Sequence, residues 1–237
     1  MGNAFELLIV WAGGGIFVAS LAYCAYSYVF PWSVPIRGAP FSVFGLGGGW
    51  PAFVFDATLL SVFAMHHSVF ARDGVKTWLS LLIPERLLRS VYVWIASILL
   101  IAVCALWQPI GTDVYQTPGG WKIAHVLIQV LGLGLIAASV RSIDPLELAG
   151  IRRSLLGGAL QTGGPYRIVR HPLYFGWALA VFGAAHMTGD RLAFATITVA
   201  YLIAAIPLEE RSLTAVFGPD YENYKRHVRW RMFPYVY

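Results

Sequence analysis

The sequence predicts an all-α, polytopic integral membrane protein with about six transmembrane helices. Of its 237 residues, 58% are hydrophobic and only 12% are charged, whereas soluble domains carry about 25% charged residues. Several uncharged runs are long enough to cross the roughly 30 Å of bilayer hydrocarbon. The nine tryptophans and twelve tyrosines suit the aromatic belts found at membrane interfaces. We therefore expect one integral membrane domain and no soluble domain.

Four apolar runs in the N-terminal part are expected to span the membrane, at residues 7–30, 51–71, 91–107 and 123–140. Apolar residues recur at helical spacing between residues 73 and 83, which favours an amphipathic helix at the membrane surface. Residues 108–120 form a short, turn-rich loop. Cys24 and Cys104 lie inside apolar runs, and we interpret them as packing residues.

The C-terminal part contains two shorter apolar runs, at residues 173–188 and 192–208. The turn Gly189-Asp190-Arg191 joins them, so we expect a helical hairpin that returns to the face from which it started. A polar connection, residues 141–170, precedes this hairpin. After it, the polar tail is predicted to form an amphipathic helix that is interrupted at Gly218-Pro219 and capped by Asp220.

The basic residues predict the orientation of these spans. With six spans, only Arg37, Lys122 and Arg191 of the 17 lysines and arginines fall on one side, and all the others fall on the opposite side. The positive-inside rule assigns the basic side to the cytoplasm. This predicts a cell inner membrane protein with both termini and the tail in the cytoplasm. Membrane topology also accounts for the net charge of +5, so we expect membrane lipids and no nucleic acid as partners.

Residues 163–176, with the sequence G-G-P-Y-R-I-V-R-H-P-L-Y-F-G, concentrate polar and aromatic side chains at the mouth of an apolar run. The acidic pair Glu209-Glu210 ends the second run of the hairpin. Because the hairpin returns, Arg170-His171 and the two glutamates are expected at the same membrane face. They form either an ion pair that closes the hairpin or a pocket for a zwitterionic ligand, with the arginine for its carboxylate and an acid for its ammonium or hydroxyl groups.

Other histidines and one glycine motif leave alternatives open. His66 and His67 lie about one turn before the cytoplasmic end of the second span, and they either pack there or line a cavity with His171. His125 and His186 fall near the other side, where together they could hold a haem. Residues 132–137 match the G-x-G-x-x-A dinucleotide motif, but they lie within an apolar run, so we interpret them as helix packing. No zinc-type cysteine spacing is present, and we expect no metal site.

The order of these C-terminal elements resembles the signature of the isoprenylcysteine carboxyl methyltransferase superfamily. The matching elements are residues 163–176, the apolar hairpin, L-E-E-R and F-G-P-D-Y-E-N-Y-K. This superfamily includes membrane phospholipid N-methyltransferases and methanethiol S-methyltransferases. The resemblance implies a multi-span enzyme that binds S-adenosylmethionine on its cytoplasmic side. The implied cofactor residues are Tyr166, Val169, Arg170, His171, Pro172, Tyr174, Gly176, Glu209, Glu210, Tyr221 and Tyr224.

The N-terminal part is similar to the methanethiol-methylating branch at residues 67–72, 85–86, 92–93 and 107–109. It departs from that branch at residues 143–150, where I-D-P-L-E-L-A-G replaces an N-H-F-D-L-F-G type of sequence. The acceptor is therefore left open among a small thiol, a prenylated cysteine carboxylate and a lipid amine. A non-enzymatic membrane accessory or haem-handling protein is the alternative of another class.

The predicted catalytic set consists of His66, His67 and Arg170. A thiol acceptor would require a base, because an unperturbed thiol is mostly protonated at neutral pH, and either His66 or His67 is the candidate. We accordingly divide the single domain into residues 1–141, with four spans on the acceptor side, and residues 142–237, with the cofactor-binding loop, the hairpin and the tail.

Overall fold

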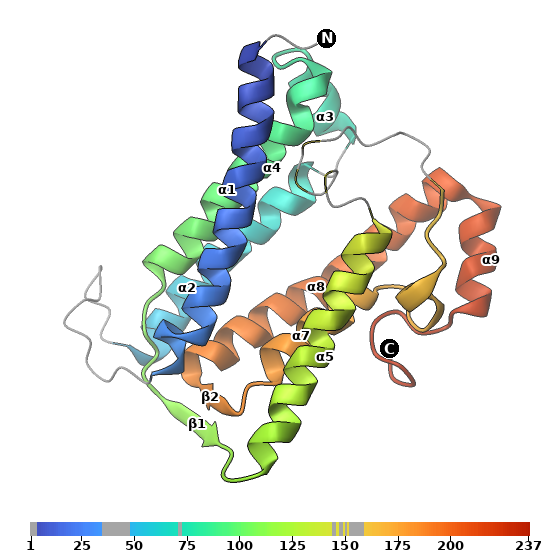
Figure 1. Cartoon of the computed structure of the whole chain (residues 1–237). Coiled ribbons are helices and arrows are strands. Elements are labelled where there is room, and N and C mark those ends of the chain that lie inside the picture. The colour runs from blue at the N-terminus through green and yellow to red at the C-terminus, as the bar shows by residue number, and fades with distance from the viewer. Residues whose placement is uncertain are drawn as a thin grey trace. The chain divides into compact units, whose positions relative to one another are not determined.

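The computed structural model describes residues 4–34, 48–70, 73–143, 146, 149, 151 and 159–237. The described part of the chain is mostly helical and contains one two-stranded sheet (Figure 1). It forms two compact units: unit 1 contains Met1–Asp113, Pro145–Ser154 and Thr188–Ala193, and unit 2 contains Val114–Asp144, Leu155–Met187 and Phe194–Tyr237. The elements are α1 (Ala4–Val29), η1 (Pro31–Ser33), α2 (Gly49–Phe70), α3 (Asp73–Ser80), α4 (Glu85–Leu106), β1 (Asp113–Gln116), α5 (Trp121–Ser142), η2 (Gly164–Arg167), α7 (Pro172–Phe182), β2 (His186–Thr188), α8 (Gly189–Phe217) and α9 (Pro219–His227).

Five of the described helices, α1, α2, α4, α5 and α8, are long and apolar enough to cross a membrane. They cover the first four predicted spans and the sixth, and α3 covers the predicted amphipathic segment. Large apolar side chains such as Leu127, Val130 and Leu131 of α5 are exposed, as expected for a surface that faces lipid. The protein is thus an all-α integral membrane protein.

Unit 1 is built around α4, which packs against α1 and α2 (Figure 1). The Trp94 indole of α4 donates a hydrogen bond of 3.0 Å to the Ile9 carbonyl of α1. Near the other end of α4, the buried Asp190 carboxylate accepts hydrogen bonds from the Trp107 indole at 2.8 Å and from the Ile110 backbone N–H at 2.9 Å. A buried carboxylate requires such hydrogen-bond partners. These bonds therefore hold Asp190 against the residues that follow α4.

The fifth predicted span differs from the structure. Residues 173–188 are helical only as far as Phe182, and residues 186–188 form β2, which pairs with β1 in a two-stranded sheet. The 11 residues of α7 extend about 16 Å, roughly half of the hydrocarbon thickness. The prediction of a full-length helix was wrong because apolarity alone does not distinguish a helix from a buried strand. β1 likewise replaces part of the predicted loop at residues 108–120.

Side chains from elsewhere in unit 2 bind carbonyl groups at the end of α7 and just after it. Gln129 donates to the Ala180 carbonyl at 2.9 Å, and Tyr115 donates to the Ala184 carbonyl at 3.1 Å. His125 Nδ1 lies 3.2 Å from the Gly183 carbonyl, and its Nε2 lies 3.1 Å from the Thr117 hydroxyl. These groups satisfy carbonyls that a helix end leaves without partners. Both nitrogens of His125 are engaged, which argues against the haem alternative.

A contact between two glycines brings α5 and α7 together (Figure 1). A Cβ atom on Gly132 would lie 2.6 Å from the Gly176 carbonyl oxygen, and one on Gly176 would lie 2.7 Å from the Gly132 carbonyl oxygen. Only glycine permits backbones to approach this closely. The interpretation of residues 132–137 as helix packing is therefore confirmed at Gly132, which lies in the middle of α5 and not at a helix N-terminus.

The helix α8 is longer than predicted and begins within the segment predicted to be a turn, at Gly189. It packs antiparallel to α7, since the Trp177 indole donates to the Thr198 hydroxyl at 3.0 Å. The break before α9 lies at Gly218, whose φ of +51° suits glycine. Gly218, and not Asp220, is the N-cap of α9, because the chain turns there and Pro219 starts the helix. Asp220 instead lies in the first turn, where a carboxylate stabilises the helix dipole.

Candidate functional site

A buried ion pair lies at the open end of the α7–α8 hairpin in unit 2. Arg170 Nε donates to Glu210 Oε1 at 2.7 Å, and the two side chains are 7% and 8% exposed. Arg170 Nη1 also donates to the carbonyls of Val228 at 2.7 Å and Arg229 at 2.8 Å. These bonds tie the segment before α7 to α8 and to the C-terminal tail, and they fix the guanidinium in one orientation.

His171 lies between the two glutamates of α8. Its Nε2 is 3.4 Å from Glu210 Oε1, and its Nδ1 is 3.5 Å from Glu209 Oε2. Its ring stacks on Tyr174, with centroids 5.4 Å apart. Burial alone would lower the pKa of His171, but the hydrogen bonds to Glu209 and Glu210 outweigh burial and raise this pKa above its ordinary value. The arrangement therefore favours the imidazolium form, with a carboxylate facing each nitrogen.

This arrangement predicts a pH-dependent stability. Because the folded-state pKa of His171 is raised, its contribution is fully present below the ordinary value of about 6.5 and is lost as pH rises through the raised pKa. We expect the Tm of the purified protein in detergent to fall as the pH rises above about 6.5, and to fall less in His171→Gln. Thermal unfolding scans at several pH values measure this. Equal slopes for the two proteins would contradict the ion pairing of His171.

The two glutamates differ in access to solvent. Glu210 is buried, and its second oxygen, Oε2, lies 3.4 Å from Arg231 Nε. The Glu209 side chain is 43% exposed, and its Oε2 accepts a hydrogen bond from the Tyr174 hydroxyl at 2.8 Å. Glu210 is thus surrounded by protein groups, whereas Glu209 presents a carboxylate that a ligand can reach.

A tyrosine cluster covers this network. Tyr221, Tyr224 and Val228 are buried together, with Tyr166 packed against them. The Tyr224 hydroxyl donates to the Tyr166 carbonyl at 2.7 Å. Burial, and then Glu209, raises the pKa of Tyr166 to about 12, so its phenol is neutral. The Tyr221 hydroxyl is buried and has no hydrogen-bond partner within the described part of the chain, which is unusual for a polar group and is consistent with a site for a ligand atom.

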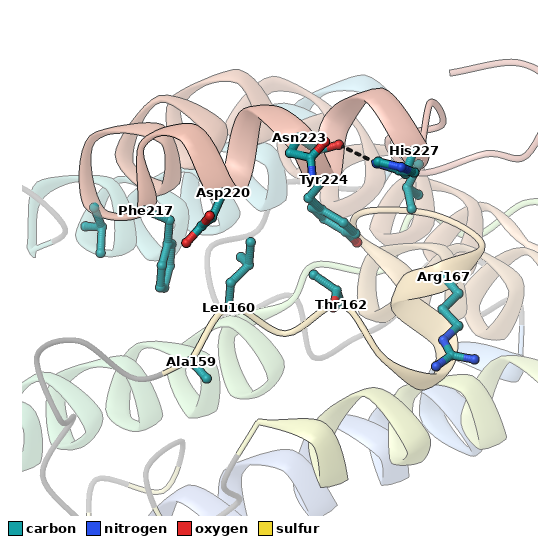
Figure 2. Close-up of a pocket in the computed structure, with 11 residues that line it drawn as sticks. Ala159, Leu160, Thr162, Arg167, Phe217, Asp220, Asn223, Tyr224 and His227 are labelled. Carbon is teal, nitrogen blue, oxygen red and sulfur yellow. Dashed lines mark hydrogen bonds between the residues drawn. The ribbon is translucent and has the colours of Figure 1, made fainter.

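A cavity of about 960 Å³ lies beside the tyrosine cluster. Figure 2 shows Phe217, Asp220 and Tyr224 on one side of it and Leu160 and Thr162 on the other. Tyr224 and Val228 belong both to the cavity wall and to the network around Arg170. The lining residues are Ala159, Leu160, Thr162, Arg167, Val216, Phe217, Asp220, Asn223, Tyr224, His227 and Val228.

The structure brings together part of the predicted site. Arg170, His171, Tyr174, Glu209 and Glu210 share one network, with Tyr166, Tyr221 and Tyr224 next to it. The other predicted cofactor residues contact protein: Val169 is buried, Pro172 lies in the first turn of α7, and Gly176 contacts α5. His66 and His67 belong to α2 in unit 1.

Sequence reasoning missed the cavity residues Arg167, Asp220, Asn223 and His227. Arg167 lies in the polar segment at residues 163–176, and the only signal of the other three was the polarity of the tail, which is equally typical of a surface that meets lipid headgroups. The segment at residues 143–150, which differs from the methanethiol-methylating branch, lies largely outside the described residues.

Comparisons with known proteins assign this architecture to a family. The family model described as phospholipid methyltransferase matches residues 122–220. Methanethiol S-methyltransferase 2 of Bradyrhizobium diazoefficiens is 39% identical over 212 residues, which cover 85% of this chain and 78% of the relative. The methanethiol S-methyltransferases of Pseudomonas deceptionensis and Crocosphaera subtropica are 35% and 37% identical; the aligned regions cover 78% and 75% of this chain and 74% and 73% of the relatives. No solved structure matches.

Proposed function

The chain belongs to the phospholipid methyltransferase family of membrane methyltransferases, and we propose that it transfers a methyl group from S-adenosylmethionine to a small thiol of the methanethiol type. Membership makes it an S-adenosylmethionine-dependent methyltransferase of the membrane. The choice of a thiol rests on relatives named methanethiol S-methyltransferases, which align with three quarters or more of this chain. The structural observation that carries the proposal is the network of Arg170, His171 and two glutamates beside a large cavity in unit 2.

The groups of the ion-pair network, the tyrosine cluster and the cavity wall fit the chemistry of the methyl donor, which has a carboxylate, an ammonium, a sulfonium and ribose hydroxyls. The exposed part of Glu209 suits a cationic group or hydroxyls, and the buried Tyr221 hydroxyl offers a hydrogen bond. Arg167 and His227 on the cavity wall suit the carboxylate, and Phe217 and Tyr224 suit the adenine ring.

We assign positioning roles to Arg170 and His171. The sequence suggested that both residues bind the donor directly. Arg170 is 7% exposed, and it already donates to Glu210 and to two backbone carbonyls. His171 lies between the two glutamates, and its nitrogens face both of them. Through Glu210 and the contact with Glu209, these residues hold the accessible Glu209 carboxylate in a fixed geometry toward the ligand.

When bound, S-adenosylmethionine supplies a methyl group on a positively charged sulfur. The residues of this chain need to hold and align that group and to exclude water, because an in-line displacement requires little covalent help from the protein. The acid pair at the mouth of the hairpin favours a cationic ligand. Phe217 and Tyr224 provide apolar surface on the cavity wall from which water can be displaced. A thiol acceptor must also lose its proton, for which His66 and His67 are the candidates.

Replacing Glu209 tests the donor site. We expect Glu209→Gln to weaken binding of S-adenosylhomocysteine about 10- to 100-fold, because a hydrogen bond to a charged group contributes about 1.5–3 kcal/mol. Calorimetry on the purified protein in detergent measures this affinity. Glu222→Gln is the matched control, since Glu222 is paired with Lys225 on α9 and lies outside the cavity wall. Unchanged affinity in Glu209→Gln would overturn the assignment.

A panel of acceptors tests the reaction. The purified protein is supplied with S-adenosylmethionine that is labelled in its methyl group, together with a small alkanethiol, a prenylated cysteine or a lipid amine. We expect the label to appear in the thiol as a thioether. Label in the prenylcysteine ester or in the lipid amine would instead identify one of the other two acceptor classes, and a haem absorption band without transfer would favour an accessory protein.

We also propose that the protein lies in the cell inner membrane, with both termini in the cytoplasm. The asymmetry of the lysines and arginines supports this orientation. The antiparallel pairing of α7 with α8 also supports it, because it returns the tail to the side of residues 163–171. An impermeant maleimide should label Asn223→Cys only after the cells are permeabilised. Labelling of intact cells would contradict the orientation.

A further inference from the structure

The imidazole of His66 in unit 1 has no hydrogen-bond partner within the described part of the chain. The residue is 8% exposed, and neither Nδ1 nor Nε2 finds a donor or an acceptor. A neutral imidazole carries one N–H donor and one acceptor nitrogen. Buried polar groups are almost always hydrogen-bonded to protein, water or a ligand. The ring of His66 therefore suits a group that the described residues do not provide.

The surroundings of this ring are aromatic. Tyr92 of α4 stacks on His66 with centroids 5.0 Å apart and planes inclined by 21°, and the Phe70 centroid lies 4.5 Å away. His67 is 5.4 Å away, edge to face. The Arg89 guanidinium lies over the Tyr92 ring, 5.2 Å from its centroid. Sulfur makes favourable contacts with aromatic rings, and a neighbouring cation stabilises a thiolate.

His66 and His67 are neighbours in sequence, but their hydrogen bonding differs. His67 Nδ1 lies 3.0 Å from the Phe63 carbonyl, which assigns the N–H of that ring to Nδ1. Part of the hydrogen-bonding capacity of His67 is thus used within α2, whereas neither nitrogen of His66 is bonded to a described residue. This difference favours His66 as the residue that meets a ligand.

Resting on the proposed function, we infer that His66 binds the acceptor thiol within unit 1 and takes its proton. The S–H group donates to the unprotonated ring nitrogen. The proton then moves to that nitrogen, which gives an imidazolium, and the electron pair of the S–H bond stays on sulfur as a thiolate. The imidazolium afterwards releases its proton to water. His67, Tyr92 and Arg89 are the titratable groups that surround the ring in the described residues.

His66→Phe removes the two ring nitrogens but keeps an aromatic ring at this position, so it tests the nitrogens alone. Phenylalanine keeps a planar ring against Tyr92. The two nitrogens that the substitution removes have no partner among the described residues. We therefore expect the Tm to stay the same or to rise. The kcat/KM for a small alkanethiol should fall about 100-fold, as expected for the loss of a general base. The affinity for S-adenosylhomocysteine should not change.

Two measurements complete the experiment. An aromatic thiol that is already ionised at neutral pH needs no base, so His66→Phe should methylate it at close to the wild-type rate. His66→Asn should lose as much activity toward the alkanethiol as His66→Phe, because asparagine is not a base. The rate of His66→Asn should rise with pH as the thiol itself ionises.

Several results would overturn the inference. They are a wild-type kcat/KM of His66→Phe for the alkanethiol, equal losses with both kinds of thiol, or a large fall in Tm, which would mean that the nitrogens have protein partners after all. A wild-type protein that binds the donor but methylates no thiol would instead contradict the proposed function.

Discussion

Glu210→Gln is expected to lower the free energy of unfolding by about 3 kcal/mol, because removing one partner of a buried ion pair leaves the other charge without compensation. Arg170 is 7% exposed, and Glu210 is its only anionic partner among the described residues. The expected loss is at the lower end of the range for buried pairs, since Arg170 retains its bonds to the Val228 and Arg229 carbonyls. The same change removes one of the two acids beside His171, so binding of S-adenosylhomocysteine should weaken as well. Thermal unfolding in detergent and calorimetry measure the two effects.

Glu222→Gln is the control for this experiment because it makes the same chemical change on α9. Glu222 lies 2.7 Å from Lys225, but its side chain is 46% exposed. Exposed ion pairs contribute about 0–1 kcal/mol, so the control should unfold close to the wild-type temperature. If both variants lost equally little stability, Arg170 and Glu210 would not form the buried pair on which the site depends.

Gly132→Ala is expected to destabilise the protein by about 2–3 kcal/mol through overpacking of a helix contact. The added Cβ would lie 2.6 Å from the Gly176 carbonyl oxygen and 2.7 Å from the Ala180 backbone nitrogen. Both are backbone atoms, so α5 and α7 would have to separate, because no side chain can rotate to make room. His171 is the N-cap of α7, and a shift of this helix should therefore also weaken donor binding. Thermal unfolding and the affinity for S-adenosylhomocysteine are the measurements.

Gly134→Ala is the matched control on the same helix. A Cβ at Gly134 has no neighbour within 4 Å among the described residues. Alanine has a higher helix propensity than glycine, so this variant should be neutral or more stable by up to about 1 kcal/mol. A neutral result at both positions would contradict the close approach of α5 and α7, whereas destabilisation at both would point to a role for glycine that is not steric.

The positions of most helices follow from the sequence, because the length and apolarity of a run suffice to predict a membrane span. The prediction was wrong at residues 183–188 for a reason that lies outside the run. The carbonyls at the end of α7 are bound by side chains of Gln129, His125 and Tyr115, which are distant in sequence. Backbone polar groups inside a membrane protein must be satisfied locally or by such partners, and hydropathy does not record those partners.

Part of the candidate site likewise follows from the sequence, and the rest depends on the fold. The sequence by itself determined that Arg170-His171 and Glu209-Glu210 meet, because a hairpin returns its second arm to the start of its first. Only the tertiary structure decided which glutamate is buried against Arg170 and which side chains line the cavity. It also decided that, among the described residues, His67 has a hydrogen-bond partner and His66 has none. Adjacent residues on a helix point about 100° apart. Their surroundings therefore depend on the helices packed against each face, and that packing is a property of the whole fold.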